Sequence, residues 1–249
     1  SLGIFSFEHL GDKLMEVQKY WDDIDFRLEH LVKDGFVKLP SLKHFGLESV
    51  ASKISTDMSG STFAELCPSH DKFIGQLSMS EYLTPKLFDI ARKNLGFKGD
   101  ISNQYHIARR VEAGNSKEMY RAHFDSHLFT MVLPVKIPTS ADGGSIGELI
   151  YFPNARKSPR SEISNFIGKA YHKRFASKQG MEKFSVRHEQ ITDDFQDYKP
   201  LLFIGNRTLH TNKQVSLGCS SYRLTLLAHF FDPSPKYGVG GMLRMLRSR

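Results

Sequence analysis

Two histidines and an aspartate have the types and spacing expected of a metal site. His123 and Asp125 are separated by one residue near the end of the run MYRAHFDSH. In an extended chain, residues two apart project from the same face, so this imidazole and this carboxylate can reach one point. His210, which follows the apolar run LLFIG and a turn, is the best candidate for a third ligand. Two histidines and one carboxylate on one face of a metal leave three positions open, which suits non-haem Fe(II) and oxygen chemistry.

A cationic residue opens a later predicted strand. Arg223 stands thirteen residues after His210, in the run YRLTLL, and Thr225 lies on the same face of that strand. A guanidinium stays charged and presents a planar fork of donors, which suits bidentate binding of a carboxylate. Arg223 therefore has the chemistry to hold the distal carboxylate of a keto acid whose other end binds the metal.

Short strands separated by turns are predicted to position these residues. From about residue 101 the chain holds six runs rich in β-branched, aromatic or alternating residues: YHIARRVE, LFTMVLPVKIP, GELIYF, KFSVRHE, KPLLFIG and YRLTLLAHFF. Many short strands without βαβ units predict an antiparallel sandwich or barrel of the jelly-roll type. The stretch after Pro153 interrupts this pattern and is predicted to hold an inserted helix, based on Ile163, Phe166, Ile167 and Ala170.

The first hundred residues are predicted to form helices that support this core. Seven apolar residues recur in steps of three and four, as on one helical face: Leu10, Leu14, Val17, Trp21, Ile24, Leu28 and Leu31. Asp22, Asp23 and Asp25 interrupt this run, and because aspartate favours capping, two helices fit as well as one. After Asp34-Gly35, the run GFVKLP predicts a short strand.

A second helix is predicted from Thr84 at the N-cap and Pro85 at the first helical position to Gly96 just past the end. The expected organisation is a single domain. It would comprise a helical support (1–100), a jelly-roll core (101–232) with a basic insertion (153–187), and a basic tail (233–249).

The order of these features resembles the Fe(II)- and 2-oxoglutarate-dependent dioxygenases. A strand, His-x-Asp, a turn, the strand GELIYF, a late histidine and a spaced Arg-x-Thr follow one another over roughly residues 101–232. The entry segment HLVKDGFVKLPSL also resembles the start of phytanoyl-CoA hydroxylase-like and prolyl hydroxylase-like members. The resemblance implies a mainly β fold with flanking helices, a double-stranded β-helix with N-terminal helical support.

The resemblance also implies roles for individual residues. His123, Asp125 and His210 would be the catalytic Fe(II) ligands, Arg223 would pair with the C5 carboxylate of 2-oxoglutarate, and Thr225 would hydrogen-bond the same group. The cofactors implied are Fe(II), 2-oxoglutarate and O2, with ascorbate in support, and the reaction implied is hydroxylation of an unactivated C–H bond. The spacing from His210 to Arg223 is longer than in many members, which implies a longer turn between them.

Comparison with particular branches of the family bears on both the reaction and the substrate. Halogenating members replace the carboxylate by a small residue, so Asp125 argues against halogenation. Nucleic-acid demethylases carry a second arginine six residues after the first, where this chain has His229. Nucleic acid is therefore an unlikely partner.

Further polar residues are assigned by strand alternation. Tyr105, Arg109 and Tyr120 are candidates for contact with cosubstrate or substrate, because Tyr105 and Arg109 share one face of their strand. His127 could line the pocket, but a structural role is favoured. For the others, His106 and His229 are expected in the core or just outside the metal ligands, and Cys219 is not expected to act as a nucleophile.

The positive charge is local. The formal net charge is +7, yet the two basic segments alone, 153–187 with nine Lys/Arg and two acids and 233–249 with four Lys/Arg and none, carry +7 and +4. A local positive field indicates an anionic substrate or partner, while a solvated surface loop fits equally well. The substrate expected is a small, anionic molecule, and peripheral membrane contact of the basic tail is possible.

Composition sets outer limits on the class of protein. With 40% hydrophobic and 24% charged residues in 249, the chain has the composition of a soluble globular protein. No run of apolar residues is long enough for a membrane span, and two cysteines cannot make a disulfide scaffold. A cytoplasmic location is expected, although the chain begins with Ser and could be part of a longer protein.

Two other classes of function fit part of the pattern. A non-catalytic jelly-roll module could use the His/Asp set for a structural or sensory metal. A cupin-type metalloenzyme without a keto-acid cosubstrate would explain the metal ligands but would leave Arg223 without a partner.

Overall fold

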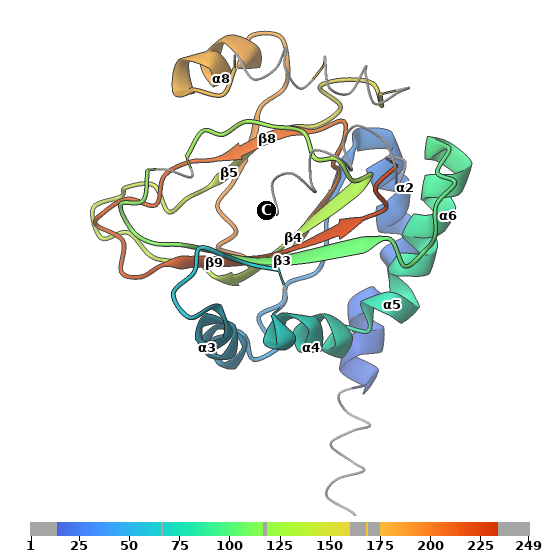
Figure 1. Cartoon of the computed structure of the whole chain (residues 1–249), viewed down its shortest axis with the longest axis horizontal. Coiled ribbons are helices and arrows are strands. Elements are labelled where there is room, and N and C mark those ends of the chain that lie inside the picture. Colours follow the sequence, from blue (N-terminus) through green and yellow to red (C-terminus); the bar gives the residue numbers. More distant parts are fainter. Residues whose placement is uncertain (1–13, 66, 117–118, 160–167, 169–174, 234–249) are drawn as a thin grey trace, which may run out of the picture.

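The computed structural model of the chain describes residues 14–65, 67–116, 119–159, 168 and 175–233. In this part of the chain, two antiparallel sheets lie opposite one another, and helices cover the outer face of the larger sheet (Figure 1). The larger sheet has the strand order β1-β7-β4-β9-β3-β2, and the smaller sheet has the order β6-β5-β8. The predicted double-stranded β-helix with flanking helices is thereby confirmed as the fold class.

The bounds of the elements are as follows. The strands are β1 (Phe36–Lys38), β2 (Phe63–Ala64), β3 (Gln104–Val111), β4 (Phe129–Lys136), β5 (Leu149–Phe152), β6 (Ile191–Asp193), β7 (Leu201–Ile204), β8 (Leu209–Asn212) and β9 (Arg223–Phe230). The helices are α2 (Ile24–Asp34), α3 (Leu47–Met58), α4 (Pro68–Gln76), α5 (Met79–Tyr82), α6 (Thr84–Leu95) and α8 (Lys178–Ser185). None of the helices within the described ranges is long and apolar enough to cross a bilayer.

Alternation along β9 separates the core from the candidate site. The residues of one face, among them Leu224, Leu226 and Phe230, are fully buried against the N-terminal helices. The other face holds Arg223, Thr225, Leu227 and His229 and turns toward the smaller sheet. Because both faces of β9 are covered, its apolar residues stabilise the helical layer while its polar residues are held inside the jelly roll.

The N-terminal apolar run forms two helices, as one of the two alternatives expected. Residues 14–21 are helical, Asp22 and Asp23 form a turn, and α2 follows. The side chain of Trp21 anchors this turn by donating from Nε1 to the backbone oxygen of Leu77 at 2.7 Å. Gly35, with φ of 86°, ends α2 in the left-handed conformation that glycine adopts most readily, and β1 begins directly after it.

Helix α6 differs by one residue from its prediction at its start. The N-cap is Leu83, and Thr84 is already helical and buried, so Thr84 makes no capping hydrogen bond. Pro85 still falls in the first turn, where its missing N–H costs nothing. Gly96 at φ 67° ends the helix as predicted.

The prediction of a strand for KFSVRHE is wrong. Residues 178–185 form α8, because the Ser177 side chain accepts the Gly180 N–H at the N-cap and Met181 and Phe184 are buried on one helical face. The strand of the smaller sheet comes slightly later, as β6. The inserted helix predicted around residues 163–170 and the basic tail after residue 233 lie outside the described residues, apart from residue 168.

Candidate metal and cosubstrate site

The segment carrying His123 and Asp125 is attached to the ends of two strands. His123 forms an isolated β-bridge with His210 of β8, in which each N–H lies 3.1 Å from the other residue's carbonyl oxygen. The N–H of Asp125 donates at 3.1 Å to the carbonyl of Gly205, which directly follows β7. Residues 80 or more positions apart in the chain are therefore held together by backbone hydrogen bonds.

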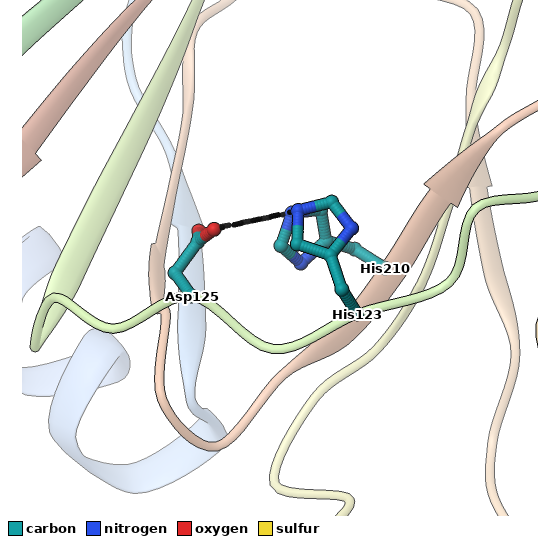
Figure 2. Close-up of side chains that lie close together, drawn as sticks. All are labelled: His123, Asp125 and His210. Carbon is teal, nitrogen blue, oxygen red and sulfur yellow. Dashed lines mark ion pairs between the residues drawn. The ribbon is translucent and has the colours of Figure 1, made fainter. Parts of the chain in front are cut away.

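The three side chains converge. The Nδ1 atoms of His123 and His210 lie 2.8 and 3.2 Å from the backbone oxygens of Arg121 and Thr208, so each Nδ1 carries the proton and donates it. Both Nε2 atoms face the carboxylate of Asp125 (Figure 2): that of His123 lies 3.5 Å from Oδ1, and that of His210 lies 3.7 Å from Oδ2. One ligand atom from each residue lies within 4.8 Å of the others. The structure thus brings together the three residues predicted from the sequence.

Electrostatics set the protonation states of the three side chains. Burial lowers the pKa of His123, but the hydrogen bond and the charge of Asp125 outweigh this lowering, so the pKa of His123 is raised. Burial alone would raise the pKa of Asp125, but the imidazoles of His210, His123 and His229 hold it well below its usual value. Burial lowers the pKa of His210 to about 4. At neutral pH the site therefore presents an ionised carboxylate beside a neutral His210 imidazole.

A recess lined by two arginines lies next to these residues. Its cavity volume is about 10 Å³, and we call it the arginine recess. Its lining residues are Arg109, Val111, Asn115, Met119, Gly147, Asn212, Lys213, Val215, Arg223 and Thr225. The register of the sheet explains the grouping, because Arg109 of β3 pairs with Thr225 of β9 and Val111 pairs with Arg223.

Arg223 is 4% exposed, and among the described residues its Nε has no hydrogen-bond partner. Its guanidinium lies 5.4 Å from the centre of the Phe195 ring. Burial, followed by the charge of Arg109, lowers the pKa of Arg223 to about 9. Gly147, at φ 83°, leaves room for this side chain, because a Cβ there would lie 3.2 Å from Cδ of Arg223. A bound anion would offset the cost of burying the guanidinium of Arg223 and its repulsion by Arg109.

Arg109 links the recess to the smaller sheet. Its Nη1 donates to Oδ1 of Asn212 at 2.7 Å, and Nδ2 of Asn212 donates to the carbonyl of Gly147 at 3.2 Å. Asn212 is two residues after His210 on the same face of β8, so this strand contributes one residue to the recess and one to the metal candidates. Asn212, Lys213 and Gly147 were missed in the sequence, although the period of two from His210 pointed to Asn212.

The remaining candidates occupy different places. Tyr105 lies inside the jelly roll, with its ring centre 6.1 Å from those of His127 and His229. Tyr120 has a left-handed φ of 51°, donates its N–H to the carbonyl of Asn212, and packs on a cluster that includes Phe124, outside the recess lining.

Two residues that were expected to have minor roles, and one arginine of the basic insertion, lie outside the recess. His106 is half-buried between β3 and α4, with Nδ1 3.8 Å from Asp71. Cys219 is half-buried, and burial raises the pKa of its thiol, which disfavours the nucleophilic thiolate. In the basic insertion, Arg156 stacks at 4.0 Å on Phe124 and donates to the carbonyl of Asn206, so its guanidinium supports the segment that carries the metal candidates.

Comparison with solved structures identifies the fold. A prolyl 4-hydroxylase from Pseudomonas putida matches 84% of this chain and 99% of its own at a TM-score of 0.52 and 12% identity. A prolyl 4-hydroxylase from Phytophthora capsici matches 93% of this chain and 73% of its own at 0.53 and 12%. The non-haem monooxygenase ThoJ, solved as a nickel complex, matches 84% of this chain and 79% of its own at 0.50 and 12%.

The chain has the fold of these non-haem oxygenases. No protein-family model and no curated protein sequence matches it. At 12% identity the double-stranded β-helix is shared while most side chains differ, so the chemistry has to be argued from the residues of this chain.

Proposed function

We propose that this chain is an Fe(II)- and 2-oxoglutarate-dependent oxygenase. The observation that carries the proposal is a His-Asp-His cluster beside a recess with two arginines, with β8 contributing His210 to the cluster and Asn212 to the recess. Two residues along a strand span roughly 7 Å, so His210 and Asn212 are separated by a distance comparable to the length of a five-carbon dicarboxylate. A metal site alone would not need the arginines.

The donor set fits Fe(II). Both histidines direct their Nδ1 protons to backbone carbonyls, which leaves the Nε2 lone pairs for a metal, and Asp125 supplies a hard anionic oxygen. His123, Asp125 and His210 would hold the ion, and when bound it would supply the activation of O2 that amino-acid side chains cannot provide.

The protein's own residues would bind and orient the cosubstrate. Arg223 is placed to receive the distal carboxylate through its fork of donors, Thr225 to donate its hydroxyl to the same group, and Arg109 to add a second positive charge. Phe203, with its ring centre 5.0 Å from that of His210, and the buried Phe195 would keep water away from the bound keto acid.

The reaction is proposed to be hydroxylation of an unactivated C–H bond in a small, anionic substrate. The anionic character rests on the basic insertion, where Lys169, Lys173 and Arg174 lie outside the described residues. Changing these three residues to Glu should weaken substrate binding and leave the substrate-free conversion of 2-oxoglutarate unchanged. A substrate whose turnover is insensitive to salt and to this triple change would contradict the anionic class.

The test of the proposed function is the conversion of 2-oxoglutarate to succinate with Fe(II), O2 and ascorbate, followed by mass spectrometry of a mixed metabolite panel for products 16 Da heavier. Succinate formation that requires both Fe(II) and the chain supports the proposal. A chain that binds metal but never converts 2-oxoglutarate would instead be a metal-binding module or a metalloenzyme without a keto-acid cosubstrate.

A further inference from the structure

Thr130 of β4 makes a hydrogen bond to the aspartate of the metal cluster. Its Oγ1 lies 2.6 Å from Oδ2 of Asp125 and 3.0 Å from Nδ1 of His229. Thr130 is 1% exposed and His229 is 8% exposed. Neither residue belongs to the predicted metal ligands or to the arginine recess.

The chemistry of the three groups fixes the direction of these hydrogen bonds. A carboxylate oxygen accepts and a hydroxyl donates, so the single hydroxyl hydrogen of Thr130 goes to Oδ2 of Asp125. The hydroxyl oxygen is then free to accept from His229, whose Nδ1 therefore carries a proton. The result is a one-way chain of donors from His229 through Thr130 to Asp125.

The larger sheet and its neighbours hold this chain of donors in place. Thr130 and His229 are directly opposite in the register of β4 and β9. The imidazole of His229 stacks on that of His127, with ring centres 5.1 Å apart. Gly205 leaves room beside Thr130, because a Cβ there would lie 2.8 Å from Oγ1.

We infer that Thr130 and His229 are positioning residues that hold Oδ2 of Asp125 and leave Oδ1 as the oxygen that binds the metal. This inference rests on the proposed function. With Oδ2 committed to the Thr130 hydroxyl, Asp125 would occupy a single position on the metal and the remaining positions would stay open for cosubstrate and O2. Hydrogen-bond partners of this kind typically change metal affinity by roughly 10- to 100-fold.

The experiment measures Co(II) binding to the full chain without O2 or 2-oxoglutarate, by calorimetry and by the visible spectrum of the bound cobalt. Thr130→Val removes the hydroxyl while keeping the side-chain shape, and Thr130→Ser keeps the hydroxyl. Thr211→Val is the matched control, because Thr211 is 3% exposed, is adjacent to His210, and has an Oγ1 without a hydrogen-bond partner within the described residues.

Thr130→Val should weaken Co(II) binding by about 10- to 100-fold and change the cobalt spectrum, because Asp125 is then free to bind through both oxygens. Thr130→Ser and Thr211→Val should bind within about threefold of the unmodified chain. His229→Phe, which keeps a stacking ring without the Nδ1 donor, should weaken binding in the same direction. This second variant carries the test if Thr130→Val fails to fold.

Normal cobalt affinity and an unchanged spectrum in Thr130→Val would overturn the inference while leaving the proposed function intact. An equal loss in Thr130→Ser would also overturn it, because the hydroxyl would then not be the cause. Failure of the unmodified chain to bind Co(II) or Fe(II) would overturn the proposed function together with the inference.

Discussion

Each of the three converging residues should be needed for the chemistry. His123→Ala, Asp125→Ala and His210→Ala should fold, as judged by thermal melting, yet lose conversion of 2-oxoglutarate by about 100-fold or more, since partners outside the metal ligands already cost roughly 10- to 100-fold. The control is His30→Ala, which removes an exposed imidazole. Near-normal turnover in any of the three variants would remove that residue from the metal site.

Arg223 should determine the affinity for 2-oxoglutarate. A hydrogen bond to a charged group contributes about 1.5–3 kcal/mol, so Arg223→Ala should raise the apparent KM for 2-oxoglutarate by roughly 10- to 100-fold. Arg223→Lys should restore affinity only in part, because an ammonium lacks the planar fork.

The neighbouring arginines of β3 provide a matched comparison for Arg223. Arg109→Ala should raise the same KM by less, and Arg110→Ala should not change it, because Arg110 lies on the opposite face over the Tyr222 ring. If Arg223→Ala leaves the KM unchanged, Arg109 becomes the first candidate for the carboxylate-binding residue.

At the scale of elements, the turn after β7 must come very close to the metal cluster. A Cβ at residue 205 would lie 2.8 Å from Oγ1 of Thr130 and 3.1 Å from Cβ of Asp125. Gly205→Ala should therefore lower metal affinity by roughly tenfold and destabilise the fold by about 1–3 kcal/mol, measured by calorimetry and denaturant unfolding. Gly75→Ala is the control, since open space surrounds that site in α4 and alanine favours helix. Equal effects at both glycines would argue against the steric explanation.

The contact of α4 with β3 should make the fold sensitive to acid. His70 of α4 is fully buried beside His106 of β3, with ring centres 5.5 Å apart, and burial lowers the pKa of His70 to about 3. In the unfolded chain the usual pKa of histidine is about 6.5. The unfolded state therefore binds the proton first, and stability is full above pH 6.5 and falls as the pH drops from 6.5 toward 3.

The loss of stability due to His70 should reach on the order of 5 kcal/mol at the acid end. His70→Leu should flatten this part of the stability profile in urea unfolding between pH 4 and pH 7. The exposed His44 offers the control His44→Gln, which should leave the slope unchanged. An unaltered slope in His70→Leu would mean that other groups cause the acid sensitivity.

At the scale of the whole molecule, metal binding should stabilise the fold. The cluster joins a segment between β3 and β4 to β8, so an ion bound there stabilises only the folded chain. At a metal concentration 100 times Kd the gain is about 2.7 kcal/mol, or roughly 5–10 °C in Tm for a chain of this size. Fe(II) or Mn(II) under argon should raise Tm, a chelator should reverse the rise, and Asp125→Ala should show none. An equal rise in Asp125→Ala would place the binding elsewhere.

The spacing of residues close together in the sequence was enough to predict much of the site. His123 and Asp125 share a face because they are two residues apart, and the same rule places Arg223 beside Thr225. Five of the six strands predicted after residue 101, and the earlier strand in GFVKLP, are present because their β-branched and aromatic residues fit buried, pleated positions. The run KFSVRHE was misassigned because a short apolar run has no clear period, and the Ser177 cap together with burial of Phe184 decided for helix.

Only the tertiary structure decided which distant residues meet. The β-bridge between His123 and His210, the pairing of Arg109 with Thr225, and the contact of Thr130 with Asp125 all depend on strand register. Alternation in the sequence places Arg109 on one face of β3 but does not say whether that face turns inward. Burying the apolar residues of β9 against the helices settles this, because it leaves the other face, with Arg223 and His229, turned toward the smaller sheet.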